Sequence, residues 1–102
     1  MKSRIENHNL VLIPETDLIA SRIDELRGYF TQKLDEHEET VHVVLDVTGV
    51  DFVDSLGVNL IVGLYRQVTD DKKTVEIIGA GRDFMKVANF FRLPSLFSIK
   101  EG

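Results

Sequence analysis

The 102-residue sequence has no cysteine and few basic residues. Without cysteine, disulfide bonds, thiolate zinc sites and cysteine nucleophiles are excluded. The 12 Lys and Arg residues stand against 17 Asp and Glu residues, which gives a formal net charge of −5. A nucleic-acid surface needs clustered Lys and Arg, and the only basic pair, Lys72-Lys73, fits a solvated turn. We therefore expect no nucleic-acid partner.

The sequence also lacks a long apolar run. The first ten residues, MKSRIENHNL, contain no apolar signal region, and every apolar stretch is far shorter than the roughly 20 residues of a membrane span. We therefore expect a cytoplasmic protein without a membrane segment. A chain of this length is expected to form a single domain over residues 1–102, because it can bury somewhat over ~60% of its unfolded surface. Such a core requires no metal or disulfide.

Apolar periodicity predicts strands that alternate with helices. Polar residues at 7–9 predict a turn between a short edge strand and a second strand, which together form a hairpin. Four-residue and three-residue apolar spacings predict the helices, and two-residue alternation predicts the strands. The expected strands begin at Ile5 and cover 10–13, 41–47, 73–79 and 96–99, and the expected helices cover about 18–35, 55–68 and 82–91.

Helices between successive strands require crossover connections, so most strands are expected to pair in parallel after the first hairpin. A parallel sheet covered on both faces has continuous apolar strands. Here His42, Asp46 and Glu76 share the second face, which indicates that this face is partly open to water. The sequence therefore predicts an α/β fold with a mixed five-stranded sheet and three helices packed on one face.

The most informative stretch covers residues 43–68, where a buried strand passes through an acidic turn into a helix. The helix must begin near Asp54 or Ser55, since both residue types are preferred N-caps. Ser55 could be only a cap. A phosphoryl group on Ser55 would also be tolerated, because a helix start offers free amides and the positive end of the helix dipole. It would add about −1.5 to −2 charges beside Asp51 and Asp54. Ser55 is therefore a candidate switch that alters binding without unfolding the protein.

The run Asp54-Ser55-Leu56-Gly57-Val58 resembles the phosphorylation motif of STAS domains of the anti-sigma-factor antagonist type. That motif is roughly Asp-Ser-(Ser or Thr)-Gly-Leu, and its serine, which corresponds to Ser55, accepts the phosphate. Glu15 and Asp17 match an acidic pair after the second strand, and residues 90–99 (FFRLPSLFSI) match the last helix and closing strand. The resemblance thus covers nearly the whole chain.

Three positions depart from the family pattern. Leu56 replaces the second hydroxyl residue, which removes a possible second acceptor and a polar contact to a kinase. Asn59 replaces a residue that is often small, and Pro14 stands where glycine is usual. The fold and the role of Ser55 therefore carry over more directly than the identity of the partner.

The resemblance implies a regulatory protein that acts by partner switching, with no catalysis, cofactor or metal of its own. Unphosphorylated, it would bind an anti-sigma factor or related serine kinase of the histidine-kinase-like ATPase family. Phosphorylation of Ser55 by this kinase would release it, and a metal-dependent serine phosphatase would reset it. The expected partner-binding residues surround the acceptor serine, and they are Glu15, Asp17, Asp54, Ser55, Leu56, Gly57, Val58 and Asn59.

Two other functions stay open from the sequence. One is a non-catalytic structural STAS subunit of a larger regulatory or transport complex, which Leu56 favours because such a subunit tolerates a changed acceptor loop. The other is a small receiver domain phosphorylated on Asp51 or Asp54, although the chain has room for only three helices. His37 and His42 are five residues apart and straddle a loop and a strand, so they form no metalloprotease motif.

Overall fold

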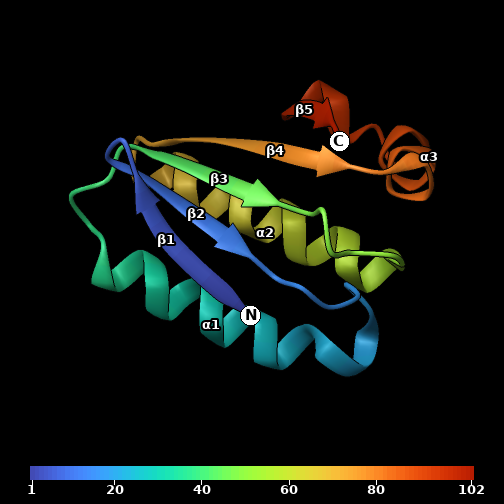
Figure 1. The fold of residues 1–102 in the computed structure, drawn as a ribbon, viewed down its shortest axis with the longest axis horizontal. Coiled ribbons are helices and arrows are strands. Elements are labelled where there is room, and N and C mark those ends of the chain that lie inside the picture. Colours follow the sequence, from blue (N-terminus) through green and yellow to red (C-terminus); the bar gives the residue numbers. More distant parts are fainter.

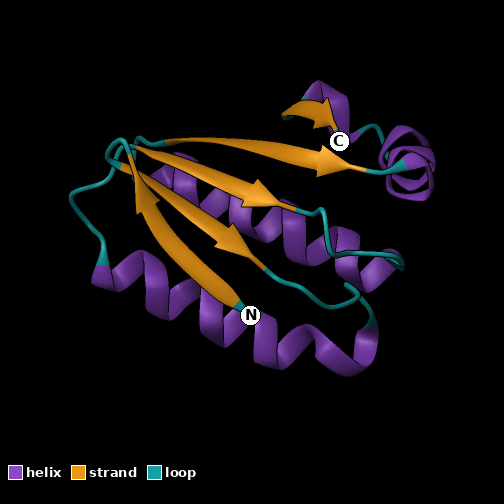
Figure 2. Ribbon diagram, in the orientation of Figure 1, coloured by secondary structure: helices purple, strands orange, loops and turns teal.

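The computed structural model describes all of residues 1–102 as one mixed sheet with three α-helices (Figures 1 and 2). The strands lie in the order β1-β2-β3-β4-β5, with β1 antiparallel to β2 and every other neighbouring pair parallel. The predicted mixed five-stranded sheet is therefore confirmed. The elements are β1 (Lys2–Glu6), β2 (Asn9–Ile13), η1 (Ala20–Arg22), α1 (Ile23–Glu36), β3 (His42–Asp46), α2 (Ser55–Asp70), β4 (Thr74–Ala80), α3 (Arg82–Phe90), η2 (Leu93–Ser95) and β5 (Ser98–Glu101).

The hairpin of β1 and β2 turns through Asn7 and His8, whose φ values are +52° and +69°. Two successive positive φ values characterise the short turns whose twist matches a hairpin. β1 begins at Lys2, three residues before the predicted start at Ile5, and Lys2 pairs with Ile13. The sequence did not indicate that the strand includes residues 2–4, because the residues of this edge strand are mostly exposed and carry no apolar alternation.

The first helix begins at Ile23, and the prediction of a start near Leu18 was wrong. Leu18 is fully buried but forms an isolated parallel bridge with Val53. Its amide donates to the Phe52 carbonyl at 2.9 Å, and its carbonyl accepts from the Asp54 amide at 3.1 Å. Because both backbone groups of Leu18 bind this distant segment, they are unavailable to a helix.

The core lies between the sheet and its helices. Helices α1 and α2 run beneath the same face of the sheet, and α3 lies beyond the carboxyl end of β4 (Figure 1). Phe84 and Ala88 of α3 belong to the same apolar cluster of 23 residues as the inner faces of the strands. On the other face, the His42 ring contacts Thr74 at 2.6 Å and Glu76 at 3.1 Å. The predicted one-sided arrangement is confirmed.

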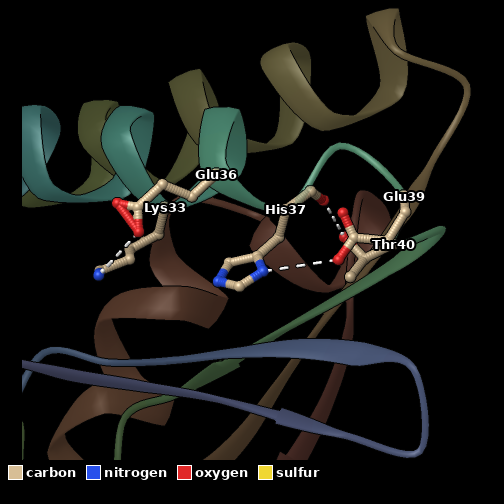
Figure 3. Close-up of polar contacts among 5 residues, drawn as sticks. All are labelled: Lys33, Glu36, His37, Glu39 and Thr40. Carbon is tan, nitrogen blue, oxygen red and sulfur yellow. Dashed lines mark hydrogen bonds and ion pairs between the residues drawn. The ribbon is translucent and has the colours of Figure 1, made fainter.

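The acidic segment at 35–39 ends α1 and turns the chain toward β3 (Figure 3). The buried Thr40 hydroxyl donates to the His37 carbonyl at 2.8 Å, and the His37 ring lies 3.6 Å from the Glu39 carboxylate. One turn earlier, the Lys33 ammonium lies 3.2 Å from Glu36. His37 therefore has its own contacts in this turn, separate from those of His42 on β3.

The C-terminal elements differ slightly from their predicted bounds. The last helix was predicted to reach Phe91 but ends at Phe90, and Phe91 is 43% exposed because Arg92 adopts a left-handed conformation with φ +59°. The last strand covers residues 98–101 instead of 96–99. Its start is delayed because Leu93–Ser95 form a 3-10 turn, in which the Leu96 amide donates to the Leu93 carbonyl at 2.9 Å.

Candidate functional site

The candidate site lies where the loops after β2 and β3 meet the beginning of α2. Ser55 is the first residue of this helix and is exposed. Asp54 is the N-cap, with an extended backbone at φ −103° and ψ −176°. The predicted helix start is confirmed, and Asp54 rather than Ser55 is the cap. The Ser55 hydroxyl is therefore not needed to cap the helix.

The Asp54 carboxylate joins two segments that are 34 residues apart in the sequence. Its Oδ1 accepts a hydrogen bond from the Gly57 amide at 2.9 Å, and its Oδ2 accepts one from the Ala20 amide at 2.9 Å. The bonds from Gly57 and Ala20 stabilise the ionised carboxylate and lower the pKa of Asp54 below its ordinary value. Asp54 thus remains charged and holds the start of α2 against η1.

Asp17 makes a second connection between the same two segments. Its Oδ1 accepts hydrogen bonds from the amides of Asp51 and Phe52, both at 3.1 Å. The bridge between Leu18 and Val53 lies directly beside these bonds. The loop that precedes Ser55 is therefore held by side-chain and backbone bonds, so the position of Ser55 is fixed by a rigid frame.

Gly57 allows α2 to approach this frame closely. A Cβ atom at Gly57 would collide with the Leu18 carbonyl oxygen and would lie 2.8 Å from both the Leu18 carbonyl carbon and Val53 Cγ2. A real Cβ atom does not approach backbone this closely. The glycine of the motif is thus required by the packing between the first turn of α2 and the bridge at Leu18.

The residues of α2 that we predicted to bind a partner are exposed at three positions and buried at two. Ser55, Leu56 and Asn59 are exposed on the outer side of α2, whereas Gly57 is buried and Val58 is only 4% exposed. Gly57 and Val58 point inward because helix geometry turns these positions toward the core. They therefore pack beneath the exposed residues of this surface in the unbound chain.

The acidic residues of the predicted set have different surroundings. Asp17 and Asp54 are partly exposed and bind backbone amides. Glu15 is exposed, and its carboxylate lies 3.7 Å from Lys2 and 3.8 Å from the amino group of Met1. Asp17 and Asp54 therefore frame Ser55, while Glu15 interacts with the start of the chain.

Phe52 lies in the loop of the candidate site and was not among the predicted partner-binding residues. Its side chain is 64% exposed, and Leu56 on the other side of Ser55 is 48% exposed. An apolar residue between Asp51 and Val53 in a turn could have signalled this exposure. Two apolar side chains therefore flank the serine in sequence and face the solvent.

The site is acidic and contains no histidine. The ion pairs of the chain do not include Asp17, Asp51 or Asp54, so the surface is negative. His8 precedes β2, His37 ends α1, and His42 begins β3, whereas Ser55 follows the carboxyl end of β3. The histidines thus lie toward the amino ends of β2 and β3, opposite the carboxyl ends that lead to Ser55.

Comparison with solved structures finds the same fold in several proteins. TM1081 of Thermotoga maritima, a candidate anti-sigma factor antagonist, has a TM-score of 0.88 at 14% identity, covering 99% of this chain and 86% of that one. The phosphorylated form of the Bacillus cell fate determinant SpoIIAA has a TM-score of 0.70 at 15% identity, covering 96% and 88% of the two chains. A sulfate transporter family protein from Wolinella succinogenes has a TM-score of 0.76 at 16% identity, covering 96% and 80%.

These identities are low, so the solved structures establish the shared fold. None of the curated protein sequences matches the chain. No helix in the structure combines the length and the apolar character that crossing a membrane demands. The family model described as the STAS domain matches residues 1–101. The chain therefore belongs to the STAS domain family.

Proposed function

We propose that the chain is a non-catalytic, partner-switching regulator of the anti-sigma-factor antagonist type, with Ser55 as its phosphate acceptor. In the unphosphorylated form it binds an anti-sigma factor or serine kinase of the histidine-kinase-like ATPase family. Phosphorylation of Ser55 releases it, and a serine phosphatase restores the hydroxyl. The main supporting observation is an exposed serine at the start of a helix whose cap and frame are formed by other residues.

The fold can accept a phosphoryl group at this position. The first-turn amides of a helix lack intrahelical partners, and the positive end of the helix dipole favours negative charge. Ser55 is exposed, and the cap uses Asp54, so adding phosphate breaks no hydrogen bond of the frame. Phosphate would instead change the surface, adding about −1.5 to −2 charges beside Asp51 and Asp54.

The release step follows from the side chains around Ser55. A partner that covers the exposed Phe52 and Leu56, which precede and follow Ser55 in the sequence, would also cover the Ser55 hydroxyl. After phosphorylation the same complex would bury a dianion beside two apolar side chains, which is unfavourable without a paired charge. In the transfer itself, the Ser55 oxygen bonds to the γ-phosphorus of ATP, its proton goes to a base on the kinase, and ADP leaves.

The test uses each purified serine kinase of the histidine-kinase-like family from the organism that encodes the chain. Ser55→Ala should remain folded, bind one kinase constitutively and gain no phosphate by intact mass. Ser55→Asp should bind poorly. Ser21→Ala, at an exposed serine in η1, is the matched control and should behave as the wild type. If the kinase phosphorylates Ser55→Ala to the wild-type level, Ser55 is not the phosphate acceptor. Phosphate on Thr48 or Thr69 would then place the switch at that residue.

A second candidate function is a non-catalytic structural subunit of a larger complex. The exposed Leu56 in place of a hydroxyl residue favours it, and the sulfate transporter family protein shares the fold. This function predicts stable co-purification with several subunits and no phosphate under any signalling condition. Phosphorylation-dependent release measured on the same protein would exclude it.

A receiver-type aspartyl phosphate is less compatible with the site. Both oxygens of Asp54 accept backbone hydrogen bonds, so phosphorylation there would break the helix cap or the bond to Ala20. Asp51 has a freer carboxylate, but its surroundings contain no clustered metal ligands. Acid-labile phosphate, detected by its loss under acidic conditions, would favour this chemistry over acid-stable phosphoserine.

A further inference from the structure

A groove between α1 and α2 begins close to Ser55 and has no role in the phosphate chemistry. It encloses about 200 Å³. Its base is apolar, with Phe30 of α1 and Leu60 and Leu64 of α2. Asn59 at its edge lies one helical turn after Leu56, so the groove continues the exposed face of α2 that starts at Ser55. The remaining residues that line it are Arg27, Gly63 and Gln67.

Gly63 keeps this groove open. It is exposed in the middle of α2, where glycine is less favourable than almost any other residue. A Cβ atom at Gly63 would meet no other atom within 4 Å, so the packing of the chain itself does not require glycine there. A longer side chain at this position would occupy the groove. The bare backbone therefore leaves space for a group from outside the chain.

The charges around the groove restrict what such a group can be. Arg27 at the edge is 61% exposed, and its only ion pair is a 3.4 Å contact with Asp24. Just before the start of α2, Asp51 and Asp54 make no ion pair. A complementary segment would present a large apolar side chain for the base of the groove, a carboxylate toward Arg27 and a cation toward the aspartates.

We propose that the groove binds one large apolar side chain of the kinase that phosphorylates Ser55. This inference rests on the proposed function and extends its docking surface along α2. The volume suits a single leucine, methionine or phenylalanine side chain, and anchors of this kind in a pocket dominate the affinity of many interfaces. The anchor would hold the kinase on α2 and so position its ATP site over the serine.

The test compares two glycines that are alike except for the groove. Gly28 in α1 is also exposed and helical, and a Cβ atom there also meets nothing within 4 Å, but it does not line the groove. Gly63→Gln should keep the circular dichroism spectrum and raise the Kd for the purified kinase about tenfold, the effect of losing one anchor. Gly28→Gln should change the Kd less than about twofold, as for a residue outside the interface.

A second variant keeps the test decisive if Gly63→Gln fails to fold. Arg27→Glu removes the proposed partner of the carboxylate and should also weaken kinase binding several-fold. If Gly63→Gln folds and binds the kinase as tightly as the wild type, the groove is not the docking site. If Gly63→Gln does not fold, wild-type binding by Arg27→Glu has the same consequence. If Ser55→Asp still binds poorly in that case, the proposed function survives. If no kinase binds or phosphorylates the wild type, both proposals are overturned.

Discussion

Replacing Asp54 tests the central structural claim, that one carboxylate both caps α2 and holds the segment containing Ala20. Asp54→Ala removes a helix cap, which costs about 0.5–2 kcal/mol, and a second hydrogen bond worth about 1 kcal/mol. The combined loss in the free energy of unfolding is therefore about 1.5–3 kcal/mol. For a chain of this size, that loss lowers Tm by about 6–24 °C.

The conservative variant Asp54→Asn separates the two bonds. Its one carbonyl oxygen can accept from the Gly57 amide or from the Ala20 amide, but the carboxylate accepts from both. We expect about half of the loss seen with Asp54→Ala. Hydrogen exchange should show which amide loses protection. Asp51→Asn, whose side chain makes no hydrogen bond in the same loop, is the matched control and should leave Tm nearly unchanged.

The pH dependence gives an independent check of Asp54. Because its pKa in the folded protein lies below its ordinary value of 3.8, the bonds stabilise the fold fully above that value. Their contribution is lost as the pH falls through the lower, folded pKa. The difference in unfolding free energy between the wild type and Asp54→Asn, measured in urea, should thus shrink below about pH 4. Equal stability of the two proteins at pH 7, with equal protection of the Ala20 amide, would refute the reasoning.

Two further predictions concern packing and the open face of the sheet. Gly57→Ala places a methyl group against the backbone of Leu18 and should cost about 3 kcal/mol or more in urea unfolding, as severe overpacking does. Gly63→Ala, in open space on the same helix, should instead stabilise the protein by about 0.5–1 kcal/mol. Similar effects at both glycines would contradict the close approach of Gly57 to Leu18. Glu76 has a lowered pKa, first because of its hydrogen bond with His42 and then because of Lys100, so its contribution is present above its ordinary value of 4.5 and lost on acidification. Glu76→Gln should accordingly lower Tm at pH 7 but have less effect near pH 3, and a constant difference would argue against this network.

Prediction from sequence succeeded where the physical signal is local or repeats regularly. Alternation in β3 and helical spacing in α2 indicated both elements, and the Asp54-Ser55 pair located the helix start within one residue. The mixed topology followed from the order of the elements. The edge strand β1 and the start of α1 were misplaced. Strand β1 is too exposed to show apolar alternation, and the start of α1 is displaced by the bridge between Leu18 and Val53.

The candidate site was predicted in part. The sequence indicated Ser55 and the nearby aspartates. It also included Gly57 and Val58, which the structure buries, among the partner-binding residues, and it omitted the exposed Phe52. Which side of a helix faces the core depends on how that helix is rotated against the sheet, and a short motif does not contain this information. The groove beside Gly63 was also absent from the sequence reasoning, since it forms between two helices that are distant in the chain.

By itself, the sequence determined the class of fold, the start of α2 and the serine at that start, because periodicity and capping depend on neighbouring residues. Only the tertiary structure decided that Asp17 and Asp54 bind amides about 34 residues away, that Gly57 must lack a side chain, and that Phe52 and Leu56 face the solvent. These properties arise from contacts between the loops after β2 and β3, which come together only when the parallel sheet brings the carboxyl ends of its strands to one edge.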